Sequence, residues 1–207
     1  VISEKQQLTF SLWVAPESYP MMKLDQDGEW FTTMLGNVKL DDNNTISGDK
    51  GGFAFQLGSR GSYKFICHVN KWQVKCEPKA KLSRYQWNHL VATVDGVNKK
   101  VTLYNNGELV ASKNCTKGEI TPGGSTLYVG KSYVEDKVDV FYLNTYNGLL
   151  DDFEIYDGIR TDIINEKAEN APVLTYSPER YVGDILRPSF HGMPTAGWTN
   201  ETHGATY

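Results

Sequence analysis

The acidic side chains best suited to acid–base chemistry lie in GLLDDFEIYD, residues 148–157. Hydrolysis of a glycosidic bond needs two carboxyl groups flanking that bond, about 5–5.5 Å apart in retaining enzymes and about 6.5–9.5 Å apart in inverting ones. If this stretch forms a strand, Asp152 and Glu154 share one face and Asp151 lies on the other. A single same-face pair does not favour catalysis, so we expect no active site in this strand.

Aromatic rings form the second chemically useful group, because exposed rings stack on sugars while a few polar groups fix the orientation. Trp72 is the strongest candidate, since it falls in the turn of an expected hairpin, and Trp30 is another. Further candidates are four tyrosines: Tyr63, Tyr133, Tyr142 and Tyr146. For each ring the alternative is core or edge packing, which is how we interpret Trp13 and Trp87.

The three cysteines, Cys67, Cys76 and Cys115, make an odd count that argues against a disulfide framework. A hairpin turning at Asn70–Gln73 would place Cys67 opposite Cys76, so a disulfide is allowed in an oxidising compartment. The alternative is two reduced thiols. No C-x-x-C spacing occurs and the four histidines do not cluster, so zinc is not expected.

The composition is that of a globular protein. The chain has 207 residues, of which 40% are hydrophobic and 22% charged, with a formal net charge of -4. This length can bury a core without disulfides or metals. Without a basic stripe, nucleic acid is not an expected partner. Because no apolar run approaches about 20 residues, no membrane span is expected either.

Short apolar stretches separated by turn signals predict about ten strands. In LTFSLWV, residues 8–14, alternate side chains from Leu8 to Val14 share one face. Reversals are expected at Asp95–Asn98 and at Asn106-Gly107. The expected strands cover 8–14, 31–36, 52–58, 63–69, 72–77, several segments of 87–112, 126–130 and 148–157. This pattern predicts an all-β fold, an antiparallel β-sandwich or barrel.

One short helix is expected within residues 159–170, with Thr161 as its N-cap and Ile163, Ile164 and Ala168 on its apolar side. After Asn170 the apolar period is lost. Residues 171–186 read as an extended linker. The last segment, 187–207, is rich in Gly, Pro, His and aromatic residues.

The order TFSLWV, WNHLVATVDG, VTLYNNGELVAS, LYVGKS and NGLLDDFEIYDGIRT resembles the laminin G-like, concanavalin A-like lectin/glucanase group over residues 1–170. This resemblance implies a jelly-roll sandwich of two curved antiparallel sheets. It also aligns Asp151 with an aspartate in a region that supplies ligands in calcium-binding members. The alternative is that Asp151 bonds a neighbouring turn.

The terminal segment RPSFHGMPTAGWTNETHGATY resembles the start of the catalytic domain of glycoside hydrolase family 32, whose hallmark is R-P-x-F-H followed by W-M-N-D-P-N-G. The matching positions are Arg187, Pro188, Phe190, His191, Trp198, Asn200 and Gly204. The resemblance implies that 187–207 begin a five-bladed β-propeller. It puts Asn200 and Glu201 at catalytic positions, with Glu201 in place of the nucleophilic aspartate, and Trp198 at a sugar-binding position.

Together the two resemblances imply an N-terminal accessory module, carbohydrate-binding or structural, of a family 32-like glycosidase. Its expected partners are an oligo- or polysaccharide, fructan in particular, and the downstream propeller of the same polypeptide. This segment alone is expected to be inactive, because the family's acid/base residue comes later in the propeller. Export to the periplasm, cell surface or medium is expected. The alternative is a protein-binding or adhesion module.

Overall fold

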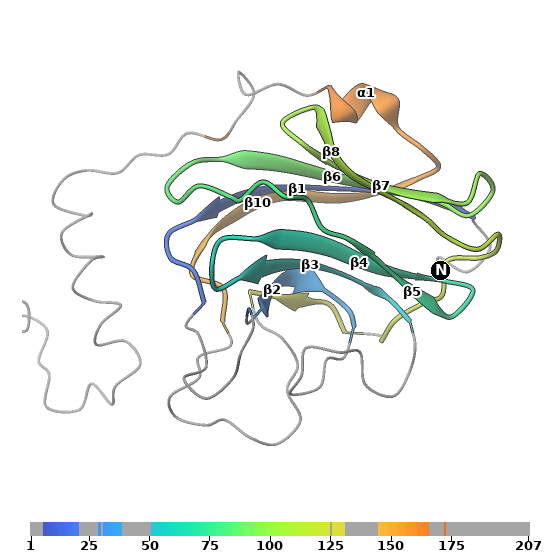
Figure 1. Cartoon of the computed structure of the whole chain (residues 1–207), viewed down its shortest axis with the longest axis horizontal. Coiled ribbons are helices and arrows are strands. Elements are labelled where there is room, and N and C mark those ends of the chain that lie inside the picture. Colours follow the sequence, from blue (N-terminus) through green and yellow to red (C-terminus); the bar gives the residue numbers. More distant parts are fainter. Residues whose placement is uncertain are drawn as a thin grey trace, which may run out of the picture. The chain divides into compact units, whose positions relative to one another are not determined.

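The structure is a computed structural model that describes residues 6–20, 29, 31–38, 51–124, 126–130, 145–165 and 172. Two five-stranded antiparallel sheets face each other, as Figure 1 shows. Sheet A has the order β10-β1-β6-β7-β8, and sheet B has the order β5-β4-β3-β2-β9. The strands are β1 (Gln7–Pro16), β2 (Phe31–Gly36), β3 (Phe53–Gly58), β4 (Tyr63–Val69), β5 (Trp72–Cys76), β6 (Asn88–Asp95), β7 (Lys100–Asn105), β8 (Glu108–Asn114), β9 (Tyr128–Val129) and β10 (Gly148–Asp157). The expected all-β sandwich is therefore confirmed.

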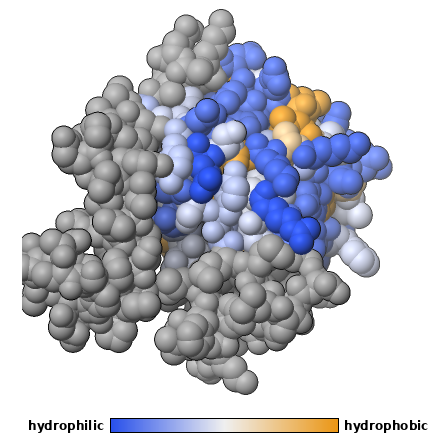
Figure 2. All heavy atoms as spheres, turned by 60° about the vertical axis from the view of Figure 1, so that its left-hand side comes forward, coloured by the Kyte–Doolittle hydropathy of each residue, from blue (hydrophilic) through white to orange (hydrophobic). Residues whose placement is uncertain are grey.

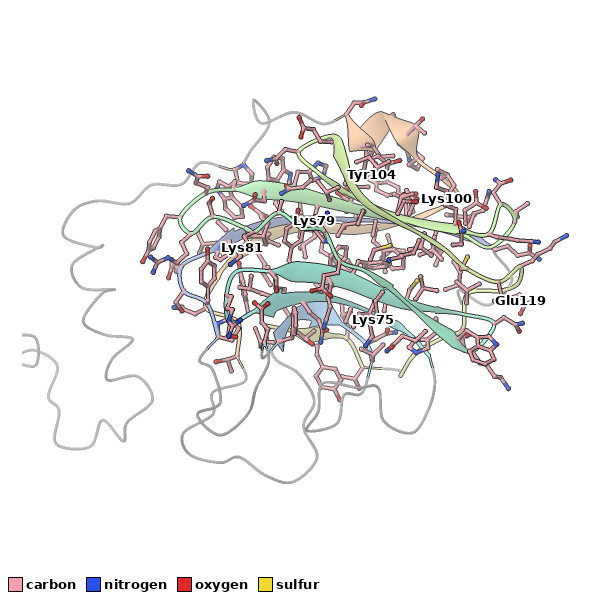
Figure 3. All side chains as sticks on the ribbon, in the orientation of Figure 1. Lys75, Lys79, Lys81, Lys100, Tyr104 and Glu119 are labelled. Carbon is pink, nitrogen blue, oxygen red and sulfur yellow. The ribbon has the colours of Figure 1, made fainter. Side chains whose placement is uncertain are left out.

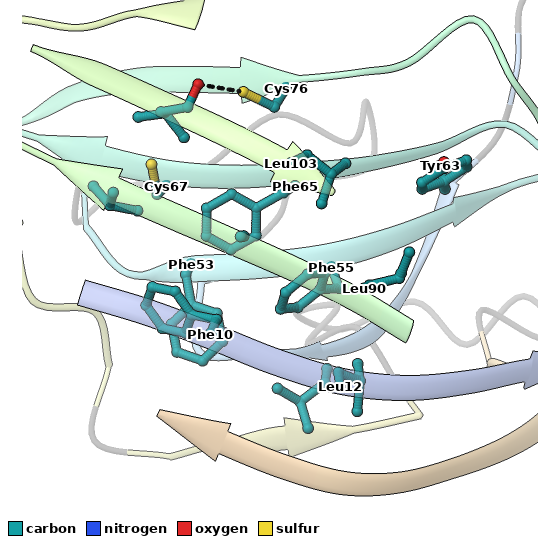
Figure 4. Packing of buried hydrophobic residues seen from close by; sticks show 14 of the residues in the cluster. Phe10, Leu12, Phe53, Phe55, Tyr63, Phe65, Cys67, Cys76, Leu90 and Leu103 are labelled. Atoms are coloured by element: carbon teal, nitrogen blue, oxygen red, sulfur yellow. Dashed lines mark hydrogen bonds between the residues drawn. The ribbon is translucent and has the colours of Figure 1, made fainter. Parts of the chain in front are cut away.

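The core fills the space between the sheets, and β1, β3, β4, β5, β6 and β7 contribute alternate residues to it. In β1, Phe10 is 1% exposed, and its ring centroid lies 4.4 Å from that of Phe53 and 5.4 Å from that of Phe65. Phe55 continues this ring cluster at 4.9 Å from Phe65 (Figure 4). Because the rings come from both sheets, their burial holds the two sheets together.

The two reversals expected between β6 and β8 are confirmed. Asp95 closes the first turn, since its Oδ1 accepts the N–H groups of Val97 and Asn98 at 3.0 and 2.8 Å. In the second turn, Asn106 and Gly107 have φ angles of 50° and 83°, the left-handed values that a two-residue hairpin requires.

The helix is shorter than expected. α1 spans Thr161–Ile164, and Arg160, not Thr161, occupies the N-cap position without a side-chain capping bond. The backbone just before the helix is instead held by Thr9 Oγ1, which donates to Gly158 O at 2.8 Å and accepts from Arg160 N–H at 3.0 Å. The segment after β10 therefore packs on the outer face of sheet A, where Ile164 is buried. Ala168 lies outside the described residues.

Backbone contacts divide the chain into Val1–Pro172 and Val173–Tyr207. The second unit lies outside the described residues, so the expected linker 171–186 and propeller start 187–207 stay predictions. Asn200, Glu201 and Trp198 belong to that unit, and Trp30 is also outside the described residues. No helix in the described part is long and apolar enough to cross a membrane.

Candidate functional site

Trp72 is the most exposed large apolar side chain among the described residues, with 68% of its surface accessible. It begins β5, directly after the turn that follows β4. Asn70 and Lys71 form this turn with φ angles of 51° and 66°, so two residues reverse the chain. The prediction that Trp72 is exposed is confirmed, whereas its role in sugar binding stays a prediction.

The hairpin tip that carries Trp72 is held by the segment 116–121. Asn70 N–H donates to Glu119 O at 2.8 Å, and Lys71 N–H donates to Thr121 Oγ1 at 2.7 Å. Thr116 Oγ1 adds a bond to the carbonyl of Val69, the last residue of β4. These hydrogen bonds, at Val69 and at both turn residues, give the exposed indole a fixed base, which reduces the entropy lost when a ligand stacks on it.

The two-residue turn overturns the expected register of the cysteines. Val69 pairs with Trp72 and Cys67 pairs with Val74, so Cys67 is not opposite Cys76. All three cysteines are free thiols. Burial raises the pKa of Cys76 to about 11 and that of Cys67 well above its ordinary value, so neither buried thiol is a reactive thiolate at neutral pH.

The acidic strand also differs from the expected alternation. A bulge in β10 lets Asp151 pair with Trp13 and Glu154 pair with Ser11, so these two acids share the outer face of sheet A. Asp152 lies in the bulge with φ of 44°. The predicted same-face pair of Asp152 and Glu154 is therefore wrong, because one extra residue shifts the two-residue period.

Asp151 Oδ1 accepts the N–H of Asp152 at 2.9 Å, so this carboxylate bonds the neighbouring backbone as the alternative interpretation expected. Calcium takes six to eight oxygen ligands. The described residues contain no group of three or more His, Cys, Asp or Glu side chains that could hold a metal ion. The described residues therefore do not complete a calcium site at Asp151. Calcium binding there stays a prediction.

Two of the candidate tyrosines are packing residues. Tyr63 is fully buried in the core and accepts a bond from Asn105 Nδ2 at 3.2 Å, and burial raises the pKa of its hydroxyl. Tyr146 is half-buried and donates to Leu149 O at 3.0 Å. The interpretation of Trp13 as a packing residue is confirmed, because it is 1% exposed and stacks on His89 at 4.7 Å. Tyr133 and Tyr142 lie outside the described residues.

A serine–histidine pair was missed from the sequence. Ser11 Oγ lies 2.7 Å from His89 Nε2 on the outer face of sheet A. The two residues are 2% and 0% exposed, so no substrate reaches the hydroxyl. The pair is structural. The sequence does not reveal it, because the two residues meet only through the register that pairs β1 with β6.

A cluster of Tyr19, Arg84 and Tyr85 was also missed. The guanidinium carbon of Arg84 lies 5.7 Å from the ring centroid of Tyr19 and 5.8 Å from that of Tyr85. The run RYQW at 84–87 was the available sequence signal.

Figure 2 shows that the described surface in its view is largely hydrophilic, with a small apolar area.

Known structures share this fold at low sequence identity. The carbohydrate-binding module CBM40 of the Ruminococcus gnavus IT-sialidase is 14% identical, with a TM-score of 0.56, over 77% of this chain and 81% of that chain. Domain 4 of AbnA, an extracellular GH43 arabinanase from Geobacillus stearothermophilus solved with arabinotriose, is 22% identical with a TM-score of 0.51, over 80% and 66% of the two chains. A SAP-like pentraxin from Limulus polyphemus is 15% identical with a TM-score of 0.50, over 78% and 69%.

No curated protein matches the chain in sequence. The laminin G-like family profile described as the concanavalin A-like lectin/glucanases superfamily matches residues 1–162, which include both sheets and the start of α1. The chain therefore belongs to the concanavalin A-like lectin/glucanases superfamily.

Proposed function

We propose that this chain is a carbohydrate-binding accessory module, and that the Trp72 hairpin is a sugar-contacting surface. The observation that carries the proposal is a 68% exposed indole on a hairpin tip whose backbone is fixed by hydrogen bonds to Glu119 and Thr121. The flat face of an indole exposed to this extent suits the apolar C–H face of a sugar.

The neighbours add support at the level of the fold. Two of them are carbohydrate-binding modules or domains of glycosidases, and their structures were solved with sialyllactose and with arabinotriose. A sandwich alone does not determine function. The proposal therefore rests on Trp72, and the neighbours only make a sugar the first ligand class to try.

Titration calorimetry of the full chain against a glycan panel that includes inulin and levan tests the proposal. We expect binding to at least one glycan, with Trp72→Ala weakening it by about 10-fold or more and Trp72→Phe retaining most of it. Leu109→Ala is the matched control, because Leu109 is 53% exposed on β8 of the other sheet. If no glycan binds, the proposal fails and the protein-binding alternative becomes the better account.

A finer part of the proposal concerns the parent protein. The match of Arg187, His191 and Trp198 to the family 32 hallmark supports a glycosidase-like propeller downstream in the same polypeptide, with fructan as its substrate class. In that protein Glu201 would stand at the nucleophile position, and the module would be exported with it. Mass spectrometry of the native protein tests this: a protein several hundred residues longer is expected, and one of about this length would contradict it.

A further inference from the structure

Tyr19, Arg84 and Tyr85, here called the arginine–tyrosine cluster, lie at the opposite end of the sandwich from Trp72. Tyr19 follows β1, and the other two residues lie in the connection between β5 and β6. Leu82 N–H, in that connection, bonds Gly61 O just before β4 begins, whereas Trp72 follows the end of β4. Figure 3 likewise places Lys81 and Glu119 at opposite ends of the sandwich. The two surfaces are therefore separated by the length of a strand, about 20 Å.

The cluster is built in advance of any ligand. Tyr19 donates its hydroxyl proton to Leu82 O at 2.6 Å, and Tyr85 N–H donates to Pro16 O at 2.7 Å. Gly61 has φ of 83°, and a Cβ there would lie 2.7 Å from the Tyr19 ring. Only glycine permits this close approach. The Tyr19 ring is therefore held by the hydrogen bond of its hydroxyl to Leu82 O and by its packing against Gly61.

Tyr85 has φ of 60°, a left-handed conformation that is unusual for a bulky side chain. The bond from its N–H to Pro16 O at 2.7 Å helps to hold it there. The strained backbone keeps the Tyr85 ring within 5.8 Å of the Arg84 guanidinium carbon. Strain retained at a surface loop is typical of segments that position a binding group.

The charge of Arg84 is not neutralised within the described part of the chain, where its contacts are with the two rings and no ion pair is formed. The same connection carries two more exposed cations, Lys79 and Lys81, against the single acid Glu77. At this end of the sandwich, Glu29 uses its Oε1 to accept the N–H of Arg60 at 2.6 Å. Among the residues that the structure describes, the cluster thus presents a stacked, positively charged fork that forms no ion pair with a carboxylate.

We propose that the arginine–tyrosine cluster binds a carboxylate-bearing sugar residue, so that this module recognises acidic glycans. A guanidinium held against aromatic rings leaves its N–H edges free, and those edges match a carboxylate with two parallel hydrogen bonds. The tyrosine rings supply apolar surface for the sugar ring beside that carboxylate. This inference rests on the proposed carbohydrate-binding function and names its ligand class.

The test is calorimetry of the full chain at low salt with trigalacturonic acid and 3′-sialyllactose, each compared with its neutral counterpart, galactotriose and lactose. At least one acidic glycan should bind about 10-fold tighter than its neutral counterpart. Arg84→Gln should weaken that binding by about 10–100-fold, the range expected for hydrogen bonds between charged groups. Arg84→Lys should recover only part of it, because lysine keeps the charge without the fork.

Lys79→Gln is the matched control, since it removes one exposed charge from the same connection without touching the rings, and it should change affinity less than about 3-fold. Equal losses for Lys79→Gln and Arg84→Gln, or no preference for either acid, would overturn the inference. If neutral glycans then still bind in a Trp72-dependent way, the proposed function survives this failure. If no glycan binds, both fall.

Discussion

Replacing Lys64 with methionine should change how the stability of the protein depends on pH. Lys64 lies on β4, is 6% exposed, and places its ammonium nitrogen 3.3 Å from the ring centroid of Phe31. Burial lowers the pKa of Lys64 from its ordinary value of 10.5 to about 8, although the nearby Glu77 and Glu29 carboxylates act in the opposite direction. The folded protein therefore releases this proton at lower pH than the unfolded chain does.

The sign and size of the effect follow from this difference. Between about pH 8 and 10.5 the unfolded chain binds more protons at this side chain, so its contribution to the free energy of unfolding rises with pH. With these two pKa values, the gain between about pH 7 and about pH 9.5 is about 2 kcal/mol. Lys64→Met removes this gain, because methionine fills similar space without titrating.

The assay is urea unfolding of the wild type and of Lys64→Met at several pH values across this window. Subtracting the two curves cancels the groups they share, including the buried thiols, whose raised pKa values lower stability as the pH rises. The wild type should gain about 2 kcal/mol over the variant. A flat difference for Lys64→Met would refute the buried position of Lys64.

Three further substitutions test the packing that supports the two surfaces. Phe10→Ala should cost about 3–5 kcal/mol in urea unfolding, because it removes a buried ring that joins the two sheets. Gly61→Ala should cost about 1–3 kcal/mol, because the new Cβ meets the Tyr19 ring and φ is positive. Ser11→Ala should cost about 1–3 kcal/mol, because it leaves a buried nitrogen of His89 without this hydrogen bond.

Each of these substitutions has an outcome that contradicts the structure. Phe10→Ala with near wild-type stability would mean that the ring does not lie between the sheets. If Gly61→Ala left the free energy of unfolding unchanged or raised it, the close approach of Gly61 to Tyr19 would be contradicted. If Ser11→Ala left it unchanged, the hydroxyl would have to face water.

The sequence allowed most of the fold to be predicted, because alternation and turn chemistry are local signals. Alternate side chains from Leu8 to Val14 enter the core between the sheets as expected, and Asn106-Gly107 gives the expected hairpin. Three expected strands, Phe31–Gly36, Tyr63–Val69 and Gly148–Asp157, agree with the structure at both ends. In these segments the same residues set both the local conformation and the buried face.

The errors arose where one residue shifts a register. A turn at Asn70 and Lys71 was hidden because Lys71 is an uncommon choice for a left-handed position, and the cysteine pairing was misplaced with it. The bulge at Asp152 carries no glycine that would have signalled it. Sequence periodicity cannot detect such insertions, although each one changes which side chains share a face.

The candidate surfaces were predictable only in part. The exposure of Trp72 followed from its place in an expected turn. The arginine–tyrosine cluster did not, because Tyr19 and Arg84 are separated by more than sixty residues and meet only through the backbone bonds that join Tyr85 to Pro16 and Leu82 to Gly61. Contacts of this kind depend on the tertiary structure and leave little trace in composition or spacing.

The most direct test of the central claim is an NMR titration that follows the indole N–H signals of ¹⁵N-labelled protein during addition of glycans, with the Trp72 signal assigned from Trp72→Phe. We predict that a bound glycan shifts the Trp72 signal in a saturable way while the buried Trp13 signal stays in place. A glycan that binds by calorimetry but leaves the Trp72 signal unmoved would contradict the claim that this hairpin contacts sugar.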